Sequence, residues 1–190
     1  MIRLLLALGV AALLAACGTP PGAGPGAAAT PVPAPAAIGW RYLGGHSFEK
    51  ETPGLGVSHR YDSSAGWVDV YVYGLRRNNW ASGVADVQFK AHFDGTISEV
   101  QALARRGDYT QLDVGVVQDS VVGGRNFRSI SFRFLRGGKP VQSFTYLTAM
   151  NGQLVKYRLS FYLPAAADPA LQARQFVEQN LRTGPGGPGV

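Results

Sequence analysis

Three glycine turns constrain the fold of this chain more than any other feature of its sequence. They are Gly123-Gly124, Gly137-Gly138 and Asn151-Gly152, and each lies between segments of alternating apolar and polar residues. Asn-Gly in such a setting is a strong hairpin signal, because both central positions of a type I′ turn need positive φ. The four segments joined in this way predict an antiparallel meander of strands at 110–117, 126–135, 141–150 and 154–163.

Two or three further strands are expected before the meander. Residues 67–74 alternate Val68, Val70 and Val72 with larger or polar side chains, and Gly66 separates this segment from a strand at 55–61. A weaker strand signal covers residues 40–48.

Helical spacing replaces strand alternation between residues 83 and 106. Gly95 is expected to kink or divide this helix, because glycine costs about 1 kcal/mol in a helix interior. A second helix is expected from Asp168 as N-cap and Pro169 as first helical residue. The apolar positions expected to face the sheet are Val84, Val87, Ala91, Ile97, Val100 and Leu103 in the first helix, and Ala173, Phe176, Val177 and Leu181 in the second.

This element order predicts an α+β fold in which helices pack on an antiparallel sheet. It resembles the Mog1/PsbP-like fold, which also has an N-terminal strand pair, a helix, a meander and a closing helix. Residues 53–61 and 68–73 also resemble a pattern in uncharacterised bacterial exported proteins. Neither resemblance includes a catalytic motif, so neither implies site residues.

The first residues predict export and lipid attachment. A basic start, a short apolar stretch and small residues before Cys17 are typical of a secretory signal rather than a membrane span. Leu14-Ala15-Ala16-Cys17 resembles the lipobox of bacterial lipoproteins, a resemblance that implies cleavage before Cys17, a diacylglycerol on its thiol and an acyl chain on its amine. Gly18 implies transfer to the outer membrane in a Gram-negative cell, where the domain would face the periplasm.

Composition then divides the chain into four expected segments. Residues 1–16 are the signal peptide, and residues 17–37 are the lipidated cysteine and a disordered tether rich in proline, glycine and alanine. Residues 38–182 form one globular domain, and residues 183–190 form a disordered tail.

The formal net charge of +6 favours anionic partners. In a cell envelope these would be lipid headgroups, an anionic polymer or an acidic protein face. The expected contact with the membrane is through the lipid anchor, and nucleic acid is not an expected partner of an exported protein. The sequence leaves the oligomeric state open.

Residues that could support catalysis are few. His46 and Ser47 could act with a nearby carboxylate in acyl chemistry, and Asp62 and Asp69 could form a carboxylate pair across adjacent strands. The alternative for all four is a role as polar residues of exposed strands. The three histidines and the single cysteine, Cys17, have no metal-ligand spacing, so no metal and no cofactor are expected.

The polar faces of two meander strands provide the preferred candidate site. If those two faces coincide, they form a common surface suited to an anionic or carbohydrate-like ligand. The alternative is that these cations only solubilise an exposed sheet face. The candidate residues are Arg133, Lys156, Arg158 and Tyr162.

The sequence therefore favours a lipid-anchored, non-enzymatic binding or assembly module for another envelope component. Two alternatives stay open. One is an envelope hydrolase that uses His46 and Ser47, or Asp62 and Asp69. The other is a carrier that holds a small apolar ligand between helix and sheet.

Overall fold

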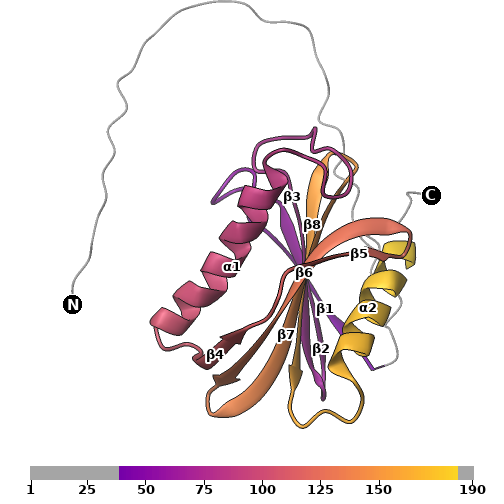
Figure 1. Ribbon diagram of the computed structural model, residues 1–190. Coiled ribbons are helices and arrows are strands. Elements are labelled where there is room, and N and C mark those ends of the chain that lie inside the picture. Colours follow the sequence, from indigo (N-terminus) through magenta and orange to yellow (C-terminus); the bar gives the residue numbers. More distant parts are fainter. Residues whose placement is uncertain (1–38, 184–190) are drawn as a thin grey trace, which may run out of the picture. The chain divides into compact units, whose positions relative to one another are not determined.

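An antiparallel sheet of eight strands, with a helix on each face, makes up the part of the chain that the structure describes, residues 39–183 (Figure 1). The structure is a computed structural model. Along the sheet the order is β1-β2-β3-β8-β7-β6-β4, and β5 also pairs with β6. The α+β fold expected from the sequence is confirmed. The strands are β1 (Arg41–Ser47), β2 (Val57–Ser63), β3 (Gly66–Tyr73), β4 (Thr110–Val114), β5 (Gln118–Val122), β6 (Arg125–Arg136), β7 (Lys139–Met150) and β8 (Gln153–Tyr162).

Two tight turns fix the register of the central strands. The β6–β7 turn is Gly137-Gly138, with φ of 56° and 76°, and the β7–β8 turn is Asn151-Gly152, with φ of 52° and 75°. These are the positive φ values that a type I′ turn requires. Because each turn has two residues, Arg136 pairs with Lys139 and Met150 pairs with Gln153.

The edge of the sheet beside β6 differs from the sequence expectation. The alternation predicts one strand over residues 110–117, but β4 ends at Val114 and β5 begins at Gln118. Both strands pair with β6, one after the other, and the amide of Gly115 still donates to the carbonyl of Ser131 at 2.9 Å. Val114 and Gln118 are four positions apart, whereas their partners on β6, Phe132 and Ser129, are three positions apart, so a bulge divides this edge.

The first helix is shorter at its start than expected, and it is not divided. Helix α1 is Phe89–Arg105, whereas the sequence predicts a start near Gly83. The backbone of Gly83 exchanges two hydrogen bonds of 2.8 Å with Ala149 of β7 and has a φ of 75°, so the chain there bridges to the sheet. Helix α1 continues through Gly95 without a break. A Cβ added to Gly95 would meet no other atom within 4 Å.

The second helix follows the sequence prediction closely. Helix α2 is Pro169–Thr183, and Oδ1 of Asp168 accepts a hydrogen bond from the amide of Ala170 at 2.9 Å. This carboxylate satisfies one of the free amides of the first turn, as an N-cap should. The expected apolar stripe is buried against the sheet: Ala173, Phe176, Val177 and Leu181.

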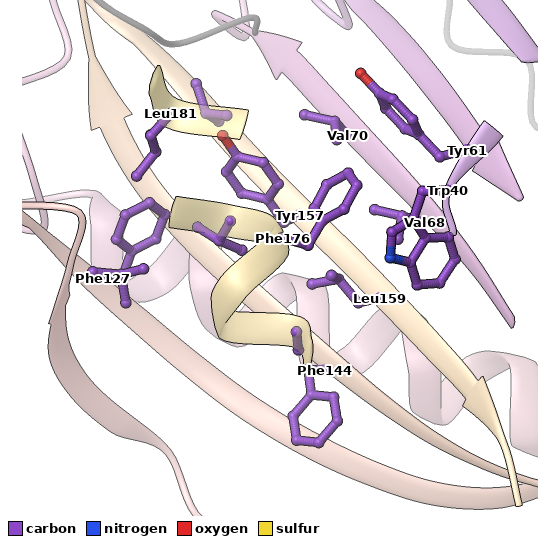
Figure 2. Close-up of a cluster of buried hydrophobic side chains, with 14 of the residues drawn as sticks. Trp40, Tyr61, Val68, Val70, Phe127, Phe144, Tyr157, Leu159, Phe176 and Leu181 are labelled. Carbon is purple, nitrogen blue, oxygen red and sulfur yellow. The ribbon is translucent and has the colours of Figure 1, made fainter. Parts of the chain in front are cut away.

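The two faces of the sheet carry separate hydrophobic clusters, one under each helix. Under α2, the rings of Trp40 and Tyr61 contact Phe176 edge-on, with centroids 5.9 and 5.2 Å away, and Val68 and Val70 of β3 lie in the same cluster (Figure 2). Under α1, the opposite side of β3 contributes its aromatic residues to the second cluster. The alternation of valines and aromatics along β3 therefore reflects burial on both faces.

Several sequence predictions concern residues outside the described part of the chain. The signal peptide, Cys17, the tether before residue 38 and the tail from residue 184 lie there. Thr183, expected as the start of the tail, is the last residue of α2.

Candidate functional site

A cleft of about 180 Å³ lies between α1 and the face of the sheet that this helix covers. Its floor comes from three neighbouring strands: Tyr71 of β3, Thr145 of β7, and Lys156 and Arg158 of β8. Helix α1 contributes Thr96, Glu99 and Val100 to its wall. The cleft is therefore a polar, cation-containing hollow beside an otherwise apolar helix–sheet interface.

Pairing along the sheet explains why these residues meet. Arg158 lies directly opposite Asp69 of β3 on one side and Thr145 of β7 on the other, and Lys156 lies opposite Tyr71. Directly opposed residues of an antiparallel pair share a face of the sheet. Arg158 is thus placed beside polar residues of both neighbouring strands, whereas Lys156 lies between Tyr71 of β3 and the apolar Leu147 of β7.

The four candidate residues predicted from the sequence do not share one surface. Arg133 pairs with Gln142 of β7, which pairs with Phe161 of β8, so Arg133 lies on the α2 face. Lys156, Arg158 and Tyr162 lie on the α1 face. The grouping that includes Arg133 is wrong, because the polar side of β6 continues the apolar side of β8.

Tyr162 shares the α1 face with the two cations but does not line the cleft. Its ring contacts Trp67, with centroids 5.5 Å apart, and Lys139 Nζ lies 5.8 Å from its centroid. Tyr162 is 40% exposed, at the end of β8. The cleft therefore retains Lys156 and Arg158 as the candidates that the structure brings together.

Arg158 has spare hydrogen-bonding capacity. Its Nη2 donates to the hydroxyl of Tyr109 at 2.9 Å, and its guanidinium lies 5.6 Å from the centroid of that ring. Its Nε is buried and has no hydrogen-bond partner among residues 39–183. The residue opposite Arg158, Asp69, is paired with Arg60 instead. Both of its carboxylate oxygens accept hydrogen bonds of 2.8 Å from Nη1 of Arg60.

Lys156 is held between aromatic rings and one exposed carboxylate. Its Nζ lies 4.9 Å from the ring centroid of Tyr71 and 5.9 Å from that of Tyr73. Glu99 Oε2 is 3.3 Å from Nζ, but the Glu99 side chain is 65% exposed, against 16% for Lys156. Burial, followed by the nearby charge of Asp69, raises the pKa of Tyr71 to about 12, so its hydroxyl stays protonated near neutral pH.

Most contributors to the site are missed by sequence reasoning, among them three polar residues that contact or lie opposite the cations of β8. Glu99 and Tyr109 reach β8 from α1 and from the loop after it, over sequence separations of 57 and 49 residues. Thr145 comes from β7, the strand that pairs with β8 through the Asn151-Gly152 turn. Only Thr145 has a usable signal, because the two-residue turn between β7 and β8 places it opposite Arg158.

The residues of the hydrolase alternative lie elsewhere. His46 and Ser47 are exposed residues of β1, a strand that ends the sheet, and neither lines the cleft. The imidazole of His46 contacts the ring of Phe48, with centroids 4.6 Å apart, and Ser47 Oγ accepts from the amide of Glu49 at 3.4 Å. The Glu49 carboxylate accepts hydrogen bonds from two loop amides. These contacts do not form a nucleophile and base pair.

Asp62 and Asp69 share a face of the sheet but are not directly opposed. Asp62 pairs with Trp67, whereas Asp69 pairs with Arg60 and forms its ion pair with it. Within residues 39–183, no group of three or more histidine, cysteine or acidic side chains is close enough to hold a metal ion. The arrangement thus gives no support to a carboxylate dyad.

The cleft does not match the apolar-carrier alternative. The two clusters are filled by side chains, and the cleft between α1 and the sheet has charged walls. Its volume of about 180 Å³ is below the range of roughly 300–1,000 Å³ that is usual for small-molecule pockets. The cleft fits a small polar group better than an apolar ligand.

Comparison with known proteins yields only a weak likeness of fold. No protein-family model and no curated protein matches the sequence. The solution structure of cyanobacterial PsbP (CyanoP) from Synechocystis sp. PCC 6803 has 17% identity over 75% of this chain and 78% of that one, with a TM-score of 0.40. A Pseudomonas aeruginosa protein of unknown function has 9% identity over 62% and 74%, with a TM-score of 0.37. The likeness to PsbP-like proteins is thus too weak to carry an argument about function.

No helix within residues 39–183 is long and apolar enough to cross a membrane.

Proposed function

We propose that this protein is a lipid-anchored, non-enzymatic binding module of the bacterial cell envelope, and that the cleft beneath α1 is its binding site. The observation that carries the binding role is the pair of cations on β8. Lys156 and Arg158 are packed against aromatic rings, yet Arg158 has no carboxylate partner in the described residues. Such a pair is suited to an anionic group on another envelope component, whether a polymer or a protein.

The anchoring role rests on the sequence before the domain. Leu14-Ala15-Ala16-Cys17 has the form of a lipobox, and two or three acyl chains are enough for stable attachment where one is not. The proposed location is the envelope, on the outer membrane if the cell has one.

Replacing Cys17 tests the anchor. The variant Cys17→Ala is expected to lose nearly all membrane association, because it removes the thiol that would carry the diacylglycerol. The measurement is the share of protein in the washed membrane fraction, together with the mass of the mature chain. Ser47→Ala, a similar small change on an exposed strand, serves as control and should fractionate as the unaltered protein does. An intact leader, a free thiol at position 17 or membrane retention of Cys17→Ala would refute the anchor.

A second pair of variants tests the binding site. Native protein is captured from cells after brief cross-linking, and the material recovered with it is compared with that recovered by Arg158→Gln and by Arg133→Gln. Both variants remove one positive charge from the sheet, but only Arg158 lines the cleft. We expect Arg158→Gln to lose most of the co-purified component and Arg133→Gln to keep it. Equal recovery by both variants would count against the cleft.

A further inference from the structure

We propose that the cleft is an oxyanion site that takes a single carboxylate or phosphate group, and that Glu99 occupies it as an internal competitor until the ligand arrives. This inference rests on the proposed function, because it uses the same cleft. It adds the chemical class of the recognised group and a role for a residue of α1.

Arg158 has a hydrogen-bonding capacity that the described residues leave unmet. A desolvated donor without an acceptor is energetically unfavourable, and more so when it belongs to a charged group. Nε of Arg158 is in this state, and Nη2, on the same edge of the guanidinium, makes one hydrogen bond to Tyr109. The Nε–Nη2 edge of arginine matches the two oxygens of a carboxylate or phosphate. Nε is shielded from solvent in the structure, so an oxyanion would pair with this edge once a small rotation of the Arg158 side chain exposes it.

The ion pair between Glu99 and Lys156 is weak. The two charges are 3.3 Å apart, and most of the Glu99 side chain is exposed. Ion pairs with such an exposed partner contribute little free energy, so a ligand anion can displace Glu99 easily. Lys156 itself is largely buried between Tyr71 and Tyr73 and cannot move away as easily.

Neutral donors around the two cations favour an oxygen ligand over a simple halide. Tyr71 keeps its hydroxyl proton, and Thr145 places a hydroxyl-bearing side chain in the floor of the cleft. Both side chains can donate hydrogen bonds, and an oxyanion with several lone pairs can accept from more than one donor at once. The floor therefore offers charged and neutral donors from three adjacent strands.

The volume limits what can enter. At ~30 Å³ per water molecule, the cleft of about 180 Å³ has room for roughly six waters. That space fits one charged group and a few neighbouring atoms, so a larger molecule would insert only its anionic end. With Glu99 displaced, Lys156 and Arg158 remain to neutralise it.

Nuclear magnetic resonance of the arginine side chains provides a direct test. Full-length lipidated protein in non-ionic detergent is titrated with acetate or with inorganic phosphate, while chloride keeps the ionic strength constant. The expected result is a saturable shift of the Arg158 Nε resonance with at least one of the two anions. The anion that produces it distinguishes a carboxylate from a phosphate source. No saturable shift with either anion would overturn the inference.

Affinities of variants, measured by calorimetry, test the roles of single residues. Loss of a charge-assisted hydrogen bond in Arg158→Gln or Lys156→Gln is expected to weaken binding by at least about tenfold. Removal of the competing charge in Glu99→Gln should strengthen binding about threefold. Arg133→Gln should leave it unchanged, and an equal loss in this variant would show that only net charge matters. An unaltered affinity in Glu99→Gln would refute the competitor role.

The outcome separates this inference from the proposed function. If neither anion binds but Arg158→Gln still loses the co-purified component, the cleft binds its partner by other contacts and only the oxyanion inference fails. If Arg158→Gln also keeps that component, both fail. Thermal unfolding of each variant, compared with that of Arg133→Gln, identifies losses that come from misfolding.

Discussion

The variant Gly152→Ala is expected to lose much more stability than Gly138→Ala, although both glycines occupy the second position of a two-residue turn with nearly the same φ. Their φ values are 75° and 76°. A left-handed conformation costs a residue with a Cβ about 1–2 kcal/mol, so both variants should lose that amount. A Cβ on Gly138 would meet nothing within 4 Å, whereas one on Gly152 would collide with the backbone oxygen of Asn78.

The extra loss in Gly152→Ala should be roughly 1–3 kcal/mol, the usual cost of overpacking. The collision arises because the loop before α1 lies against this turn, where the amide of Trp80 donates to the carbonyl of Gly152 at 3.2 Å. Urea unfolding of the two purified variants measures the difference. Equal midpoints would mean that the loop is not seated on the turn as described.

The variant Phe161→Ala should be destabilised by about 3–5 kcal/mol, the usual cost of emptying a buried aromatic site. Phe161 is fully buried on the α2 face, where its ring centroid lies 5.8 Å from that of Trp40 and 6.2 Å from that of Phe144. A cavity there would open between the rings of Trp40 and Phe144, which are held by different segments of the chain, so collapse around it is restricted.

Its neighbour in the chain is the matched control. Tyr162 follows Phe161 on β8, points to the other face and is 40% exposed. Tyr162→Ala loses mainly one aromatic contact, with Trp67, and should cost about 1 kcal/mol. Chemical unfolding of both variants provides the comparison. Similar losses would contradict the assignment of these two side chains to a buried and an exposed position.

In α1, the periodicity of the sequence predicts some of the buried residues wrongly. Helical spacing predicts Val87 and Ala91 in the buried stripe of the first helix, but Val87 is 96% exposed and Ala91 is exposed as well. The buried residues of α1 are Phe89, Phe93, Thr96 and Val100. Val87 lies before the first residue of α1, and within the helix the larger phenylalanines occupy the interface because they bury more apolar area than Ala91 would.

The placement of Arg133 with the cations of β8 is an error that the turns themselves can correct. Two-residue turns pair Arg136 with Lys139 and Met150 with Gln153, and counting back along the strands then places Arg133 in line with Phe161. The turn chemistry is plain in the sequence, but its consequence for the register has to be followed across two hairpins. Counted in this way, the residues alone separate Arg133 from Lys156 and Arg158.

Apart from the division of one edge into β4 and β5, the order of elements, the positions of the hairpin turns and the alternation along each strand were determined by the sequence, because each depends on residues only a few positions apart. The contacts that bring α1 and its following loop to the cleft were decided by the tertiary structure. Whether Glu99 and Tyr109 reach β8 depends on how α1 and its following loop lie on the sheet. Those contacts join residues far apart in the chain, and side-chain packing across the whole interface selects among them.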